Sequence, residues 1–213
     1  MNRLIMIGSG GHAKAIMSSL SDLYRENLIG YVDIKEDIYF SRKLKYLGND
    51  EIVAEKYQNE SVELIIGLSY LGSKVDINLR KKIIDFYLHK NFDFISIISS
   101  NAYISNECKI GRGSFIAPGA KIIANAKISP FCSINTGVII EHDTVIHKNV
   151  QIASGSIICG GAKVGENSFV GAGSIIRDGI SIPKNTIIGM GSVVTKSIYE
   201  SGVYLGNPTR KIS

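Results

Sequence analysis

The chain has 213 residues, 45% of them hydrophobic, and is long enough to bury a core as one domain or two. Its 24 Lys and Arg exceed its 19 Asp and Glu, but no basic cluster with interleaved aromatic residues indicates a nucleic-acid partner. Three widely spaced cysteines without a CxxC pair favour neither a disulfide framework nor a cysteine-rich zinc site. The sequence shows no signal-peptide pattern and no long apolar window, so we expect a cytoplasmic protein that does not span a membrane.

The first part of the sequence has the pattern of a parallel α/β unit, in which apolar strands alternate with amphipathic helices. The expected elements are strands at residues 3–7, 28–32 and 62–66, helices at 13–20 and 76–90, and a strand near 94–98. We therefore predict a Rossmann-like domain with a parallel sheet over residues 1–95.

A glycine turn, Gly8-Ser9-Gly10-Gly11-His12, joins the first expected strand to the first helix. Such a turn directs backbone N–H groups and the positive end of the helix at an anion, although the full GxGxxG spacing is missing. Asp33 ends the second strand, where a carboxylate can accept hydrogen bonds from a ligand. Both features lie at the sheet edge where open α/β sheets bind ligands, and a tight turn without a ligand is the alternative.

From residue 98 the sequence repeats every six residues. Every sixth residue from Ile98 to Val194 is an aliphatic β-branched residue, and most positions two before these are small. A period of six fits neither a helix nor a single strand, so we predict a parallel β-helix that points one branched side chain inward from each flat side. This domain is expected over residues 96–213, with Cys108 and Cys132 as core residues and the tail from Lys196 as a cap.

One corner of the repeat carries candidate catalytic groups. His142 is expected to point outward between Glu141 and Asp143, where it can act as a general base while a carboxylate orients its ring. An idle surface histidine is the alternative, and His147 is expected to be one. Only these two histidines lie in the repeat, so a zinc site with three imidazoles is not expected. Cys159 has no evident activating partner for a role as nucleophile.

The repeat resembles that of the left-handed hexapeptide acyltransferases. Together with the turn GSGGHAK, the strand end YVD, the segment INTGVIIEHD and the tail GVYLGNPTRK, it makes the whole chain similar to sugar acetyltransferases of the PglD/NeuD type, including the VioB, PglD and perosamine N-acetyltransferases. The resemblance implies a left-handed β-helix, a homotrimer with active sites between subunits, and acetyl-CoA as co-substrate without a metal.

The resemblance also implies roles for individual residues. The catalytic residues would be His142 as base, Asp143 as the acid that tunes it, and Asn135. The nucleotide sugar would bind at Gly10, Gly11, His12, Asp33, Ile34 and Gly67. Acetyl-CoA would contact Gln151, Gly160, Ala172 and Met190, with the Gly160 N–H as oxyanion donor. Gln151 stands where many relatives carry a second histidine, so its role at the thioester is open.

These features predict acetyl transfer to the C4 amine of a nucleotide-linked 4-amino-4,6-dideoxysugar, dTDP- or UDP-linked, for capsule, O-antigen or other glycan synthesis. Direct attack on the thioester needs no covalent enzyme intermediate. O-acetylation of sialic acid is the nearest alternative, although EHD in place of EHG favours an amine acceptor. A non-catalytic scaffold that binds a nucleotide sugar is a third possibility.

Overall fold

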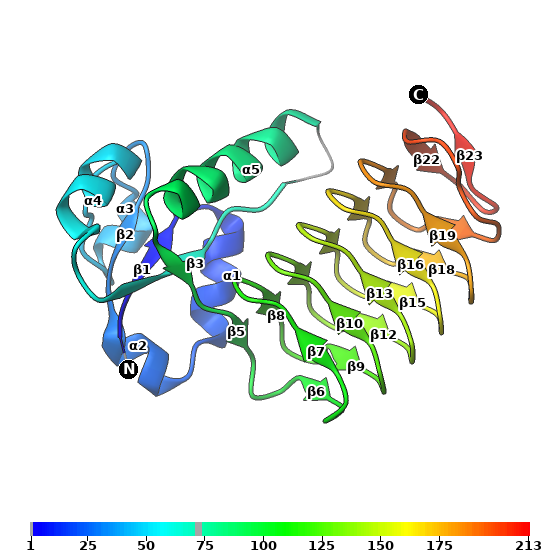
Figure 1. Cartoon of the computed structure of the whole chain (residues 1–213), viewed down its shortest axis with the longest axis horizontal. Coiled ribbons are helices and arrows are strands. Elements are labelled where there is room, and N and C mark those ends of the chain that lie inside the picture. The colour runs from blue at the N-terminus through cyan, green and yellow to red at the C-terminus, as the bar shows by residue number, and fades with distance from the viewer. Residues whose placement is uncertain (1, 71–73) are drawn as a thin grey trace.

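The computed structural model describes residues 2–70 and 74–213, and consists of an α/β unit followed by a coil of short strands (Figure 1). The α/β unit contains a four-stranded parallel sheet in the order β2-β1-β3-β4. Its strands are β1 (Arg3–Ile7), β2 (Leu28–Val32), β3 (Val62–Ile66) and β4 (Asp93–Phe94). Its helices are α1 (Gly11–Ser19), α2 (Asp22–Asn27), α3 (Ile38–Ser41), α4 (Asp50–Tyr57) and α5 (Lys74–His89). No helix in these two described ranges has both the length and the apolar character needed to cross a bilayer.

The first three strands lie where the sequence predicts them, and α1 and α5 lie within two residues of the predicted helices. The helices α2, α3 and α4 were not predicted from the sequence. Because α2 buries none of its residues and α3 has only four, neither carries a helical apolar period. The start of α4 is marked only by its N-cap, Asn49, whose side chain accepts a hydrogen bond from the backbone N–H of Ile52.

The prediction of one strand near residues 94–98 is wrong, because two strands share this segment. β4 ends at Phe94 in the α/β sheet, and β5 (Ile97–Ile98) belongs to the coil. The backbone N–H of Ile95 still donates to Leu64 of β3, whereas that of Ile97 donates to Ser114 of the coil. On these contacts we propose the domain boundary between residues 95 and 96.

The coil is a left-handed parallel β-helix, the fold that the resemblance implies. Its two-residue strands pair in parallel with the equivalent strands of the next coil and form three sheets. Each sheet is named by the α/β unit or the side chains on its outer side. The domain face, toward the α/β unit, consists of β5, β8 (Phe115–Ile116), β11 (Ser133–Ile134), β14 (Gln151–Ile152), β17 (Phe169–Val170) and β20 (Ile187–Ile188). The isoleucine face consists of β6 (Tyr103–Ile104), β9 (Lys121–Ile122), β12 (Ile139–Ile140), β15 (Ile157–Ile158), β18 (Ile175–Ile176) and β21 (Val193–Val194). The lysine face consists of β7 (Lys109–Ile110), β10 (Lys127–Ile128), β13 (Val145–Ile146), β16 (Lys163–Val164) and β19 (Ser181–Ile182).

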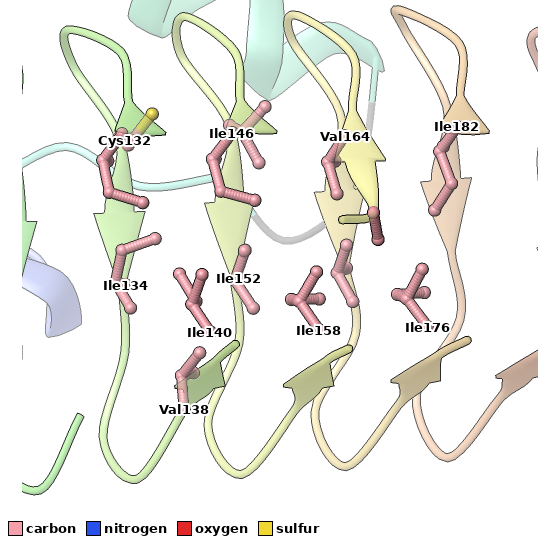
Figure 2. Close-up of a cluster of buried hydrophobic side chains, with 14 of the residues drawn as sticks. Cys132, Ile134, Val138, Ile140, Ile146, Ile152, Ile158, Val164, Ile176 and Ile182 are labelled. Carbon is pink, nitrogen blue, oxygen red and sulfur yellow. The ribbon is translucent and has the colours of Figure 1, made fainter. Parts of the chain in front are cut away.

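The second residue of each short strand points into the coil, and these side chains stack as ladders (Figure 2). From Ile116 to Val194 every inward aliphatic residue is at most 3% exposed. Ile98 is 41% exposed because no coil covers the outer side of the first one. Cys132 is buried in this core and Cys108 packs against it, which confirms their predicted role as core residues.

The corners of the β-helix use a left-handed backbone conformation at every sixth residue from Gly113 to Gly191. Glycine or asparagine occupies these positions except at Phe131 and Asp143. Gly165 is a corner glycine that does not have a positive φ. A Cβ at Gly165 would lie 2.4 Å from the backbone nitrogen of Lys184, so space between coils requires this glycine.

The tail after the last rung closes the C-terminal end of the coil, as predicted. β22 (Val203–Leu205) pairs in parallel with β20, and β23 (Arg210–Lys211) pairs antiparallel with β22. Figure 1 shows the coils following one another from the α/β unit to this cap.

The α/β unit packs directly against the first coils. Ile97 and Phe115 of the domain face share a buried cluster with Met6 and Ile16. The ring of Phe131 packs edge-on against Phe94, with 5.2 Å between the ring centres. This shared core fixes the glycine turn next to the domain face of the β-helix.

Candidate active site

The glycine turn at the start of α1 leaves open space above it. Gly10 is the N-cap of α1 and Gly11 its first residue, and neither has a positive φ. A Cβ on either would meet no other atom within 4 Å. Gly8 differs, because its φ is +92° and a Cβ there would lie 2.7 Å from Leu68. Packing and conformation therefore explain Gly8, whereas Gly10 and Gly11 leave room for a ligand.

His12 lies in the first turn of α1 and faces the β-helix. Its ring packs edge-on against Phe115 with 5.4 Å between ring centres, and its Nε2 lies 3.4 Å from Ser133 Oγ. Burial lowers the pKa of His12 to about 3, and the positive charge of Arg80 contributes. His12 is therefore neutral near pH 7 and can hydrogen-bond a ligand without carrying charge.

A cavity of about 510 Å³ joins the glycine turn to the β-helix. It is lined by Gly10, Gly11, His12, Gly67, Leu68, Ser69, Asn135 and Ser154. Gly67 is required by close packing, because a Cβ would lie 2.8 Å from the carbonyl oxygen of Ile7. Five residues that the sequence analysis singled out thus border one space, which we call the acceptor cavity.

Asp33 holds the glycine turn against the end of β2. Its Oδ2 accepts hydrogen bonds from the backbone N–H and the hydroxyl of Ser9, at 2.8 and 2.6 Å, and its Oδ1 accepts one from the N–H of Ile34. Asp33 and Ile34 border a smaller cavity of about 160 Å³. Its other lining residues are Ile7, Gly8, Val32, Asp50, Leu68, Leu79 and Ile83. The two cavities share Leu68, so they are neighbours at the carboxyl edge of the sheet.

His142 lies at the corner between the isoleucine and lysine faces. Its Nδ1 is 2.9 Å from Asp143 Oδ2, and this hydrogen bond lowers the pKa of the Asp143 carboxyl. Asp143 has a φ of +58°, a conformation in which Asp is tolerated better than most residues. The corner of the next coil brings Gly160 so close that a Cβ there would lie 2.6 Å from His142 Nε2. His142, Asp143 and Gly160 therefore form one group, in which the backbone of Gly160 faces Nε2, the ring nitrogen that does not bind Asp143.

The remaining expected residues lie along other parts of the β-helix. Asn135 is at a corner between the domain and isoleucine faces, and Ser154, Ala172 and Met190 continue along the same edge. Met190 is 80% exposed. Because the isoleucine face separates this edge from His142, one chain does not bring the histidine to the acceptor cavity.

Gln151 lies on the domain face and is 1% exposed. Its Oε1 accepts hydrogen bonds from Ser69 Oγ at 2.9 Å and from the backbone N–H of Tyr70 at 3.2 Å. The residue is thus beneath the loop after β3, and its assignment to acetyl-CoA stays a prediction.

The residues that join the two domains were not predicted from the sequence. Ser69 and Tyr70 follow Gly67 at the carboxyl end of β3, and this position at the ligand-binding edge was an available signal. Arg80 on α5 and Ser133 on the domain face carry no such signal. Their roles depend on which face of the coil the α/β unit covers.

Cys159 is the first of the other reactive groups of the described residues to compare with the His142 corner. Burial raises the pKa of the Cys159 thiol, which lowers the fraction of nucleophilic thiolate. Within residues 2–70 and 74–213, no three His, Cys, Asp or Glu side chains are placed to hold a metal ion together.

Two kinds of family model match the chain in the order of its two structural units. Residues 3–87 match the PglD N-terminal domain. Residues 143–178 match the bacterial transferase hexapeptide, and residues 161–196 match the hexapeptide repeat of succinyl-transferase. The chain thus combines a segment like the PglD N-terminal domain with a segment of hexapeptide repeats. The family resemblance predicted from its motifs is thereby confirmed.

Solved structures match the chain over both units. The acetyltransferase domain of PglB from Neisseria gonorrhoeae has a TM-score of 0.88 and 22% identity, with 100% of each chain covered. PerB from Caulobacter crescentus, solved with CoA and GDP-perosamine, has a TM-score of 0.87 and 25% identity over 100% of this chain and 98% of its own. WeeI from Acinetobacter baumannii has a TM-score of 0.82 and 23% identity, with 99% of each chain covered. These likenesses establish the predicted two-part fold.

A curated relative covers less of the chain. An uncharacterized protein of Acanthamoeba polyphaga mimivirus is 31% identical over 129 residues, or 59% of this chain. The matched part is only 23% of the viral protein.

Proposed function

We propose that the chain is an acetyl-CoA-dependent N-acetyltransferase that acts on the C4 amine of a nucleotide-linked 4-amino-4,6-dideoxysugar. The observation that carries the proposal is the group of His142, Asp143 and Gly160, in which a carboxylate-bound imidazole faces a bare backbone. Support comes from PerB, which has the same two-part fold and was solved with CoA and an amino-sugar nucleotide.

The geometry of this group fits direct acyl transfer. The amine nitrogen of the sugar attacks the thioester carbonyl while His142 Nε2 takes the amine proton. Asp143, bound to Nδ1, stabilises the resulting imidazolium, and the Gly160 N–H donates to the oxyanion. Collapse of the tetrahedral intermediate breaks the C–S bond, and the CoA sulfur takes the proton from His142. No covalent enzyme intermediate is needed.

The acceptor cavity suits the nucleotide sugar. The open N-terminus of α1 at Gly10 and Gly11 can receive the diphosphate, because backbone N–H groups and the helix dipole favour an anion there. Neutral His12 borders the same cavity. The smaller apolar cavity beside Asp33 suits the base, and Asn135 lies where the acceptor cavity meets the β-helix. The product would enter capsule, O-antigen or another glycan, made from cytoplasmic precursors.

We also propose a homotrimer in which neighbouring chains complete each active site. The outward residues of the isoleucine face include Ile139, Ile157, Ile175 and Val193, whereas Lys109, Lys127 and Lys163 point outward from the lysine face. A continuous apolar row on a sheet face is typical of an interface between subunits. Packing along this face would place the His142 edge of one chain near the Asn135, Ala172 and Met190 edge of the next, with acetyl-CoA between them.

A parallel acceptor assay tests the proposed reaction. Thiol release from acetyl-CoA would be followed with dTDP-4-amino-4,6-dideoxyglucose, its UDP and GDP counterparts, and free sialic acid. We expect turnover with one amino-sugar nucleotide and N-acetylation of the product by mass spectrometry. Activity with sialic acid alone would indicate an O-acetyltransferase. No activity with any of the four acceptors would reject the proposed enzymatic function.

A further inference from the structure

The loop that follows β3 forms one wall of the acceptor cavity but is held by the β-helix. Leu68 and Ser69 line the cavity. Beneath them, Gln151 Oε1 accepts hydrogen bonds from Ser69 Oγ and from the backbone N–H of Tyr70. The Tyr70 hydroxyl donates to the carbonyl oxygen of Asn149 at 2.7 Å. The position of this wall therefore depends on the coil that carries Gln151.

Two neighbouring rungs of the domain face support two walls of the same cavity. Ser133 pairs with Gln151 in the sheet, and its hydroxyl lies 3.4 Å from His12. Both are 1% exposed, so they contact the α/β unit and not solvent. Ser133 thus supports the His12 wall and Gln151 supports the Ser69 wall.

Arg80 ties the same loop from its other side. Its Nε donates to the carbonyl oxygen of Leu68 at 2.8 Å, and its guanidinium binds the Asn149 side chain. Arg80 is 1% exposed. Contacts from α5 and from the β-helix therefore converge on residues 68–70.

The two ends of the Gln151 amide are used differently. The oxygen accepts two hydrogen bonds, whereas the buried Nε2 has no partner in the described part of the chain. Leaving the Ser69 hydroxyl and the Tyr70 N–H without their acceptor would cost about 1–3 kcal/mol each unless the loop moved. The loop is therefore expected to shift if the oxygen is removed.

We propose that Gln151 is a positioning residue for the acceptor substrate, which acts through its side-chain oxygen by holding Ser69 and Tyr70 at the cavity wall. This role differs from a direct contact with the thioester, for which Gln151 would have to donate through Nε2. The inference depends on the proposed function for its kinetic form, because it assigns the acceptor cavity to the nucleotide sugar.

A pair of substitutions at residue 151 separates the two roles. Gln151→Glu keeps acceptor oxygens at the same length and loses the N–H donors. The buried cation of this region is Arg80, which binds Leu68 of the same loop and Asn149. Gln151→Leu keeps the approximate side-chain volume and loses both the acceptor oxygen and the N–H donors. We expect the Leu variant to raise KM for the nucleotide sugar about tenfold, with kcat and KM for acetyl-CoA changed less than about threefold. The Glu variant should remain within about threefold of the wild type in all three constants.

The opposite pattern would overturn the proposal. If Nε2 stabilises the thioester oxygen in the transition state, the Glu variant should lose about 10²–10³ in kcat with an unchanged KM for the sugar. Ser69→Ala, which removes one of the two donors, provides a milder change at the other end of the contact. Its KM effect should be largely absent in the Leu background, because both substitutions break the same hydrogen bond. Additive effects of the two substitutions on KM would contradict the hydrogen bond between Ser69 and Gln151. Ser69→Ala also tests the proposal if Gln151→Leu fails to fold.

Binding measurements separate failure of this inference from failure of the proposed function. If the wild type turns over none of the four acceptors, calorimetry with dTDP, UDP and GDP replaces the kinetics. The Leu variant should then bind the preferred nucleotide about tenfold more weakly, and the Glu variant should bind it normally. Equal affinities in all three proteins, or no nucleotide binding by the wild type, would reject the positioning role.

Discussion

His142 and Asp143 occupy a corner that the repeat makes at every coil. The left-handed corner position that Asp143 occupies holds Gly or Asn in most other coils. The backbone conformation therefore does not by itself require a carboxylate there. The carboxylate binds Nδ1 and leaves Nε2 toward Gly160. We infer that chemistry and not folding accounts for Asp143.

A comparison of two corner histidines tests the catalytic assignment. We expect His142→Ala to lower kcat by about 10²–10⁴, because proton transfer from the amine would lose its base. His147→Ala is the matched control, since His147 is also exposed at a corner of the repeat but is not part of the group with Gly160. Steady-state thiol release measures both. A loss below about tenfold in His142→Ala would contradict the role of base.

Gly11 allows stability and ligand binding to be separated at one residue. A methyl group there meets no atom within 4 Å, and alanine is favoured over glycine in a helix. Gly11→Ala should therefore leave the free energy of unfolding unchanged or raise it by up to about 1 kcal/mol. It should raise KM for the nucleotide sugar by about tenfold or more, because the methyl group enters the acceptor cavity. Denaturant titration and kinetics measure the two effects, and unchanged KM would exclude the diphosphate from this turn.

At the scale of elements, burial in the ladders is uneven along the coil. Ile158 is fully buried in the middle of the stack, whereas Ile98 is 41% exposed in the first coil. Both are second residues of short strands and have the same side chain. The difference in their exposed fractions therefore depends on whether neighbouring coils cover the residue on both sides.

Matched truncations measure this effect of stacking. Ile158→Ala should lower the free energy of unfolding by about 2–5 kcal/mol, because the removed atoms leave a cavity between coils. Ile98→Ala should cost about 1 kcal/mol or less, since much of the side chain already meets water. Denaturant unfolding of both variants gives the comparison. Equal losses would contradict the observed packing of the first coil.

At the scale of the molecule, the three faces of one repeat meet three different surroundings. The domain face is covered by the chain's own α/β unit, the lysine face presents charge to solvent, and the isoleucine face has no partner within the described residues. The group of His142, Asp143 and Gly160 and the acceptor cavity lie at opposite edges of this third face. Assembly would therefore both bury the apolar row and bring the two edges together.

Substitution on this face tests the assembly. Ile157→Lys should convert the proposed trimer to monomers and abolish most of the proposed acetyl transfer, because a charge would have to be buried between chains. Val145→Lys is the control, since Val145 lies between Lys127 and Lys163 in register on the lysine face. Light scattering after gel filtration reports the mass, and activity is measured on the same fractions. A trimeric, active Ile157→Lys protein would show that the interface lies elsewhere.

The sequence by itself determined the repeat, most of the sheet and the pairing of His142 with Asp143 at one corner. The six-residue period from Ile98 to Val194 reflects a requirement of every coil, so it predicts the β-helix without distant contacts. His142 could be paired with Asp143 because they are neighbours along the chain. The glycine turn likewise follows directly from β1, and its open edge is a property of parallel sheets.

Only the tertiary structure decided which outward residues became interior. Phe115, Ser133 and Gln151 occupy the same position in their rungs as Lys127 or Ile157, and nothing local distinguishes a covered face from an exposed one. Docking of the α/β unit on the domain face buries them and lowers the pKa of His12. The physical reason is that periodicity records which side chains point inward within a coil, whereas contacts between units depend on surfaces assembled from residues far apart in the chain.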